Sequence, residues 1–301
     1  MLCDDIIADE ILQADYDGLD AVCAKIARAQ KFMLSKDFAA AADGLVDNHA
    51  ELRRIVPYCR TPHPLTWIEF LHDERPHWDC TGPYKARAVD PSRHQLPPQR
   101  VGFLLEQEDD EAKVWLTHLF WSAKVLPPGG VTKHNGSLGS IRFDLRRIGR
   151  SDDALIDVVI PAPAQFGQQL MQDLGHRLPA VVNRLLEYTV EDWGGETRFL
   201  VSVLGLLNAR NVVELESVDH TEWNAKRERK GQRPLFSHKI LKIRPAIYRS
   251  MRASDSAQHH DVRMHFVRGH WKHRRSGLFW WRMHTRGKID LGFVDKDYEV
   301  I

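Results

Sequence analysis

The residues best suited to binding or catalysis lie in the last quarter of the chain, between His220 and Gly287. This segment holds 17 of the 42 lysines and arginines but only 4 of the 41 acidic residues. It also holds 8 of the 16 histidines and 4 of the 9 tryptophans. Its formal charge is therefore near +13, and the rest of the chain is near −12. Such an asymmetry is typical of a chain with a polyanion-binding portion.

A β-hairpin is predicted within this segment, with strands at 262–273 and 278–285 and a turn that ends at Gly277. On the first strand His270 and Lys272 share one face, while Trp271 and His273 share the other. Neither face is cleanly apolar, which indicates that one of them does more than fill a core.

Basic and aromatic side chains interleaved on strands suit a nucleic-acid contact face. Arginine and lysine complement phosphate charge, and tryptophan stacks on unpaired bases, at about 1–3 kcal/mol per base in single-strand binders. We therefore predict that the chain binds DNA or RNA. The predicted contact residues are Arg227, Arg229, Lys230, Arg233, Arg268, His270, Trp271, Lys272, Arg274, Arg275, Trp280, Arg282 and Arg286.

Three other interpretations of the same residues stay open. The hairpin can be a solvated basic surface whose tryptophans pack inward. It can also be a metal-independent nuclease site, in which histidines exchange protons and arginines stabilise the phosphorane; its candidates are His265, His270, His284, Arg268 and Arg286. The third is a metal site formed by the histidines of the hairpin. No H-E-x-x-H motif occurs and no carboxylate lies among these histidines, so no metal is predicted.

The remaining sequence excludes several classes of protein. Cys3, Cys23, Cys59 and Cys80 have neither the spacing of a zinc site nor the density of a disulfide framework. No phosphate-binding loop, dinucleotide fingerprint or nucleophile elbow occurs, and no cofactor is predicted. The start of the chain lacks a signal peptide, and the apolar stretch Phe199–Leu207 is too short to span a bilayer. We expect a cytoplasmic protein with no membrane contact.

The predicted fold class is α+β. Helical spacing over 19–33 and 36–56 predicts a helical N-terminal unit over residues 1–60. Strand patterns, among them Leu65–Leu71 and Val114–Ser122, predict an antiparallel sheet over 61–160. A helical insert over 161–211 and a basic α/β region over 212–301 follow, the latter with a helix at His220–Lys230 that ends at Gly231. Residues 61–301 are predicted to form one domain.

Three motifs of the chain resemble those of a group of uncharacterised phage and prophage proteins. They are the run from Asn224 to Leu235, which fits N-x-x-R…G-x-x-P-L, the R-G-H sequence at Arg268–His270, and the closing K-x-Y at Lys296–Tyr298. The Pro64–Glu69 piece is also similar to their early strand. The resemblance covers mainly the C-terminal third and does not extend to the helical N-terminus. It implies a mobile-element origin and a bacterial host, and no activity.

The leading hypothesis is thus a nucleic-acid-binding accessory protein of phage or prophage origin. The metal-independent nuclease is the first alternative. The second is an adaptor or inhibitor that binds a host protein, for which the acidic first two-thirds of the chain would supply the contact.

Overall fold

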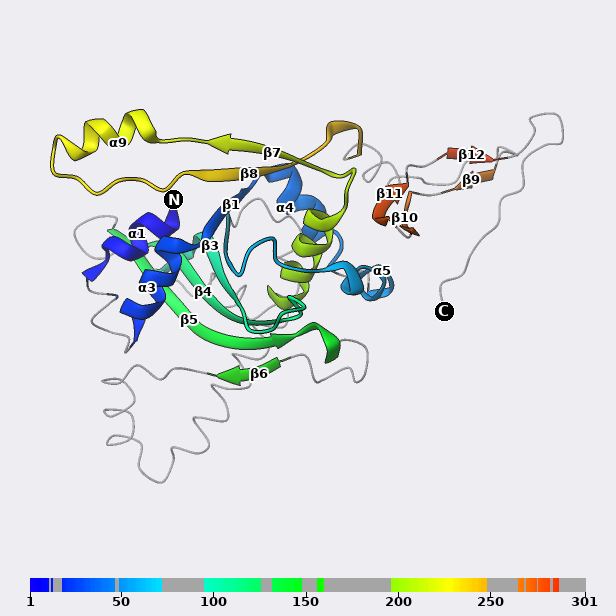
Figure 1. The fold of residues 1–301 in the computed structure, drawn as a ribbon, viewed down its shortest axis with the longest axis horizontal. Helices are drawn as coiled ribbons and strands as arrows, with labels where there is room; N and C mark the ends of the chain where they lie inside the picture. Colours follow the sequence, from blue (N-terminus) through cyan, green and yellow to red (C-terminus); the bar gives the residue numbers. More distant parts are fainter. Residues whose placement is uncertain are drawn as a thin grey trace, which may run out of the picture.

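An eight-stranded sheet forms the centre of the molecule (Figure 1). The computed structural model describes residues 1–10, 12, 18–46, 49–71, 95–125, 132–147, 156–159, 196–247, 265–267, 269–274, 276–281 and 284–286. The strands lie in the order β6-β5-β4-β3-β2-β1-β8-β7. Their bounds are β1 Gln30–Leu34, β2 Leu65–Leu71, β3 Gln95–Gln107, β4 Val114–Val125, β5 Thr132–Asp144, β6 Ile156–Val159, β7 Val213–Val218 and β8 His238–Ile243.

The sheet is mixed. β1 runs parallel to both of its neighbours, β2 and β8, and the other neighbouring strands are antiparallel. The strands from β2 to β6 adjoin one another in sequence order and so form a meander. The predicted α+β class is confirmed. The antiparallel sheet predicted over 61–160 is confirmed for β2 to β6, and β1, from the predicted helical N-terminal unit, joins it in the parallel direction.

Helices pack on both faces of this sheet (Figure 1). On β2, Ile68 and Phe70 belong to the larger core, whereas Trp67 belongs to the smaller one, because successive strand residues point to opposite faces. The larger core includes α4 Lys36–Asp43, α5 His49–Ile55 and the helical residues 196–208. The smaller core includes α1 Leu2–Ala8 and α3 Leu19–Arg28. The described residues also include the short 3-10 helices η1 Val56–Tyr58 and η4 Leu145–Arg147.

The helix predicted over residues 19–33 is wrong in its last third. α3 ends at Arg28, and β1 begins at Gln30. Phe32 and Leu34 alternate into the larger core, each 2% exposed, as strand residues do. Because β1 lies between β2 and β8, the first 60 residues supply a strand to the middle of the sheet.

The predicted C-terminal hairpin is confirmed. β10 His270–Arg274 pairs antiparallel with β11 Gly277–Trp281, and β9 His265–Val267 pairs with β12 His284–Arg286 in the same register. Gly277 closes the turn with a φ of +126°, a conformation that residues with a Cβ rarely adopt.

Most of the predicted helical insert, over residues 161–195, and the closing motif at Lys296–Tyr298 fall outside the described residues. Among the helices that the structure does describe, none is long and apolar enough to cross a membrane.

Candidate functional site

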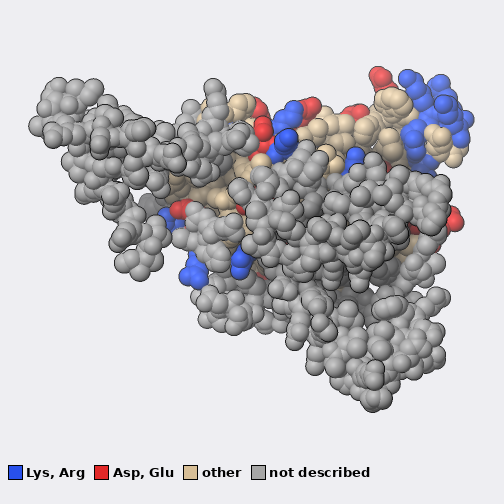
Figure 2. All heavy atoms as spheres, turned by 180° about the vertical axis from the view of Figure 1, so that it is seen from behind, with Lys and Arg blue, Asp and Glu red and all other residues tan. Residues whose placement is uncertain are grey.

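The helix α9, Thr221–Glu228, lies at the far end of a projection that consists of β7, α9, β8 and their connections, residues 213–243 (Figure 1). We call this projection the arm. Seen from behind, lysine and arginine side chains gather over the end of the molecule that carries α9 (Figure 2). No residue of α9 is buried, so a core does not dictate the composition of this helix.

Local hydrogen bonds fix both ends of α9. At its start, the Asp219 carboxylate accepts from the backbone N–H of Thr221 at 3.0 Å and from its hydroxyl at 2.7 Å. These bonds hold the pKa of Asp219 below its usual range. At its end, Gly231 adopts a φ of +67° and donates its N–H to the carbonyl of Glu228. The prediction of a helix that stops at Gly231 is therefore confirmed to within a turn.

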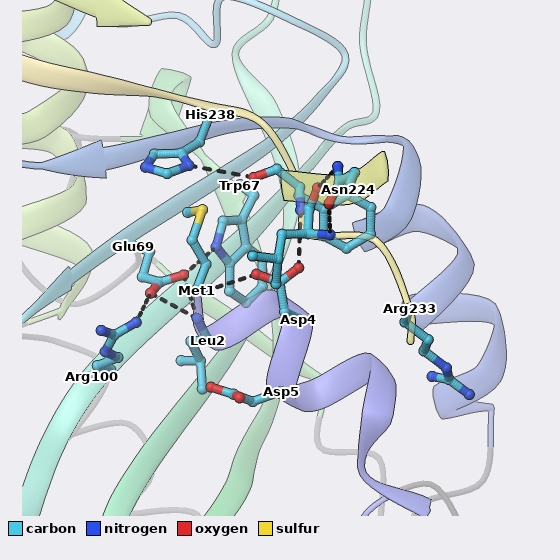
Figure 3. A network of polar contacts seen from close by, with 12 residues as sticks. Met1, Leu2, Asp4, Asp5, Trp67, Glu69, Arg100, Asn224, Arg233 and His238 are labelled. Atoms are coloured by element: carbon cyan, nitrogen blue, oxygen red, sulfur yellow. Dashed lines mark hydrogen bonds and ion pairs between the residues drawn. The ribbon is translucent and has the colours of Figure 1, made fainter. Parts of the chain in front are cut away.

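Two of the residues predicted to contact nucleic acid, Arg227 and Arg233, form hydrogen bonds that stabilise the arm. Arg227 Nε donates to the carbonyl of Arg233 at 2.7 Å, and Arg233 in turn donates from Nη1 to the carbonyl of Ile7 at 2.6 Å. The Asn224 side chain reinforces this, because it donates to the carbonyl of Leu235 and accepts from its N–H (Figure 3). Part of the hydrogen-bonding capacity of Arg227 and Arg233 is thus used within the protein.

The base of the arm is bonded to the N-terminal helices (Figure 3). The Asp4 carboxylate accepts from the N–H of Phe236 at 3.1 Å. The ring of Phe236 lies 4.0 Å from Lys31 Nζ, which donates to three carbonyls at the end of α3. Burial lowers the pKa of Lys31. Lys31 therefore caps α3 and has no role on the surface.

Three cations of α9 and the turn after it remain open to solvent. Lys226, Arg229 and Lys230 are exposed, and they form no ion pair with any residue in the described part of the chain. Beside them Trp223 is 64% exposed, with Lys226 Nζ 5.8 Å from its ring centroid. We call Trp223, Lys226, Arg229 and Lys230 the tip cluster. Two exposed acids, Glu222 and Glu228, share the helix.

The tryptophans that were predicted to contact nucleic acid in the hairpin are buried instead. Trp271 is 3% exposed and Trp280 is 8% exposed, and their rings meet edge to face at 5.0 Å within the larger core. A base has no access to either ring in this fold. The inward packing of these tryptophans was one of the alternatives that the sequence left open.

Hydrogen bonds from Arg210 and Asn211 to β11 attach the hairpin to the rest of the protein. The side-chain amide of Asn211 donates to the carbonyl of Trp280 at 2.9 Å and accepts from its N–H at 3.1 Å. Next to it, the N–H of Arg210 donates to the carbonyl of Leu278 at 3.3 Å. The side chain of Asn211 thus takes the place of a neighbouring strand along the edge of β11.

The other side of the hairpin carries a basic group around Trp281, which the sequence analysis did not single out. Lys272 Nζ lies 3.3 Å and the Arg274 guanidinium carbon 5.2 Å from the ring centroid of Trp281, and His270 stacks on that ring at 6.4 Å. The signal that could have found Trp281 is the register, which places it opposite His270. Its indole already has two cations and a histidine against it.

The predicted contact residues therefore do not form one continuous field. α9 and the β10–β11 hairpin lie toward opposite ends of the long axis of the molecule (Figure 1). Arg227, Arg229, Lys230 and Arg233 belong to the arm, and His270, Lys272 and Arg274 belong to the hairpin. Arg268, Arg275 and Arg282, and the side chain of Arg286, lie outside what the structure describes.

Of the three histidines proposed for a nuclease site, only His270 has a described side chain. The backbones of His265 and His284 are placed by strand pairing. His265 lies opposite Arg286, His284 lies opposite Val267, and His270 lies opposite Trp281. The side chains of His265 and His284 are outside the described set, so their catalytic roles stay predictions. Within the described residues, no three His, Cys, Asp or Glu side chains gather as a metal site would require.

Several groups with perturbed pKa values, among them Cys59, Glu69 and His118, are buried away from the arm. Glu69 is fully buried and accepts hydrogen bonds from the N–H of Leu2, the Trp67 indole and Arg100 (Figure 3). Burial raises the pKa of Glu69, and these donors oppose the rise. Its donors connect α1, β2 and β3, so its role is to hold the N-terminal helix on the sheet.

No known protein family, curated protein or solved structure was found to match the chain.

Proposed function

We propose that this protein is a nucleic-acid-binding accessory protein and that the tip cluster is its main contact surface. The observation that carries the proposal is the set of exposed cations, Lys226, Arg229 and Lys230, which lack ion-pair partners in the described part of the chain. A cation that stabilises a fold usually forms an ion pair or donates hydrogen bonds within the protein. Arg227 and Arg233 donate to backbone carbonyls in this way. Unpaired cations at the end of a projection are well placed for phosphates.

The basic group of the hairpin is a secondary contact in this proposal. His270, Lys272 and Arg274 surround Trp281 and leave its ring little access to a base. Phosphate contacts are the chemistry that this surface supports, with the cations positioned by the indole.

An origin in a phage or prophage, and a cytoplasmic setting in the bacterial host, belong to the same proposal. Their support is the resemblance of the Asn224–Leu235 run and the Arg268–His270 sequence to phage and prophage proteins. Within the first of these motifs, Asn224, Arg227 and Leu235 form hydrogen bonds of the arm.

A charge-matched pair of variants tests the contact surface. The first variant replaces Lys226, Arg229 and Lys230 with alanine. The control replaces three exposed cations on α3, α4 and α5, namely Arg28, Lys36 and Arg53, so that both variants lose the same net charge. Binding of fluorescent DNA and RNA oligonucleotides is measured by anisotropy.

Counterion release sets the expected size of the effect. Three single-strand phosphate contacts contribute about 100-fold to affinity at about 0.1 M salt. The tip variant should lose roughly this factor, and the control should bind within a few-fold of the wild type. Equal losses in the two variants would mean that only the net charge matters. No binding by the wild type at low salt would remove the proposal.

A further inference from the structure

We infer that the ligand of the tip cluster is a single-stranded nucleic acid and that Trp223 stacks on one of its unpaired bases. This inference rests on the proposed function and adds the ligand class and the residue that selects it. Trp223 was not among the residues that the sequence analysis singled out.

The exposure of Trp223 carries the first step. Its side chain is 64% exposed, whereas Trp67 and Trp115 are fully buried and Trp271 and Trp280 nearly so. A tryptophan offers 150–250 Å² of surface, so leaving it in water forgoes a large hydrophobic gain. Because α9 buries none of its residues, core packing among the described residues does not account for this ring.

The spacing on α9 carries the second step. Trp223, Lys226 and Arg227 are three and four residues apart, so they share one face of the helix. Lys230 follows at seven residues, in the turn just past the helix. Lys226 lies 5.8 Å from the ring of Trp223, which places a phosphate-binding cation directly beside an aromatic surface. Single-strand binders combine these two elements, a basic track for the backbone and an aromatic ring for a base.

The contrast with Trp281 carries the third step. Lys272 lies 3.3 Å from the centroid of Trp281, and Arg274 and His270 also lie against that ring. At Trp223 the cation is 5.8 Å away, and the larger part of the side chain is open. Of these two tryptophans, Trp223 is therefore the one that a base can reach.

A paired duplex is a poor partner for such a ring. Its bases already stack on one another, so a surface indole reaches a base only where the strands are open. Phosphate contacts from Lys226, Arg229 and Lys230 would act on either form of nucleic acid. Selectivity for single strands should therefore depend on Trp223, and overall affinity should depend on the cations.

The test compares Trp223→Ala and Trp223→Phe with Leu215→Ala. Leu215 is a matched control, because it is 55% exposed on β7 of the same arm. Each full-length variant is titrated against a labelled oligothymidylate of about 20 nucleotides and against a duplex of the same length, by fluorescence anisotropy.

Loss of one stacked base should weaken single-strand binding by Trp223→Ala roughly 5- to 150-fold. Duplex binding should change less than about threefold, Trp223→Phe should recover most of the affinity, and Leu215→Ala should match the wild type. Unchanged single-strand binding by Trp223→Ala would overturn the inference, and so would an equal loss on the two ligands. Those results leave the proposed function intact, whereas a wild-type protein that binds neither ligand overturns both.

Discussion

Acidification should destabilise the protein through one buried histidine, His118 on β4. This side chain is 9% exposed, and its Nε2 has no hydrogen-bond partner among the residues that the structure describes. Burial, together with the nearby Lys25 ammonium and against the opposing effect of Glu106, lowers the pKa of His118 from 6.5 to about 4. In the native state His118 therefore stays neutral down to about pH 4, whereas in the unfolded chain it takes up a proton near pH 6.5.

The sign and size of the effect follow from this difference. Between pH 6.5 and pH 4 the unfolded state binds one more proton at His118 than the folded state, so the free energy of unfolding falls as the pH falls. The slope is about 1.4 kcal/mol per pH unit, and the accumulated loss at pH 4 is about 3 kcal/mol. Above pH 6.5 this contribution is complete and no longer varies.

The assay is urea denaturation of the wild type and of His118→Leu at a series of pH values from 7.5 to about 4. Leucine removes the titrating group and an unpaired polar atom, so at pH 7.5 the variant should be within about 1 kcal/mol of the wild type. The difference between the two proteins should then shift by about 3 kcal/mol in favour of the variant as the pH falls.

A second variant tests the cause of the shift. Lys25 Nζ and Glu106 form an ion pair of 2.6 Å near His118, so Lys25→Met should raise the pKa of His118 and reduce the total loss of stability between pH 6.5 and pH 4. A stability difference between wild type and His118→Leu that is constant with pH would refute the reasoning, because His118 would then titrate alike in both states.

Three further predictions concern the packing of the sheet and hairpin. Gly102→Ala should destabilise the protein by about 1–3 kcal/mol in urea denaturation, because the new Cβ would lie 2.3 Å from the ring of Trp67; wild-type stability would contradict the packing. Asn211→Ala should cost about 1–3 kcal/mol and speed hydrogen exchange at the Trp280 amide, which loses its acceptor. The thiol of Cys59, whose pKa burial raises to about 12, should react with Ellman's reagent only on unfolding, and rapid reaction of the native protein would contradict its burial.

The strands of the sheet were the most predictable part of the fold. Leu65–Leu71 was predicted with the bounds that β2 has, since its β-branched and aromatic residues alternate between two buried faces. β1 was missed because the spacing from Leu19 to Met33 fits a helix as well as a helix followed by a short strand. The choice depends on pairing with β2 and β8, which lie far away in the sequence.

The hairpin shows a different limit. Its two strands and the turn that ends at Gly277 could be predicted from the strand patterns and the glycine, and both were found. Which face of the hairpin packs against the rest of the protein could not be predicted. That choice depends on Asn211 and on the helical residues 196–208, which lie far from the hairpin in sequence. Trp271 and Trp280 are therefore among the predicted contact residues although they pack inward, which was the open alternative, and Trp281 is not among them.

Trp223 could have been found from the sequence. It is the one large apolar residue in the helix Thr221–Glu228, so that helix has no apolar stripe to bury. The preference for the hairpin came from its density of arginine, histidine and tryptophan. Residue density in the sequence does not distinguish side chains that stabilise the hairpin from side chains that bind a ligand.

The salt dependence of single-strand binding tests the central claim most directly. The logarithm of the association constant falls with the logarithm of salt concentration by about 0.7 for each phosphate contact. Replacing Lys226, Arg229 and Lys230 with alanine should therefore make the slope shallower by about 2, whereas replacing Arg28, Lys36 and Arg53 should leave it unchanged. Identical slopes for the wild type and the tip variant would contradict the assignment of this surface as the nucleic-acid contact.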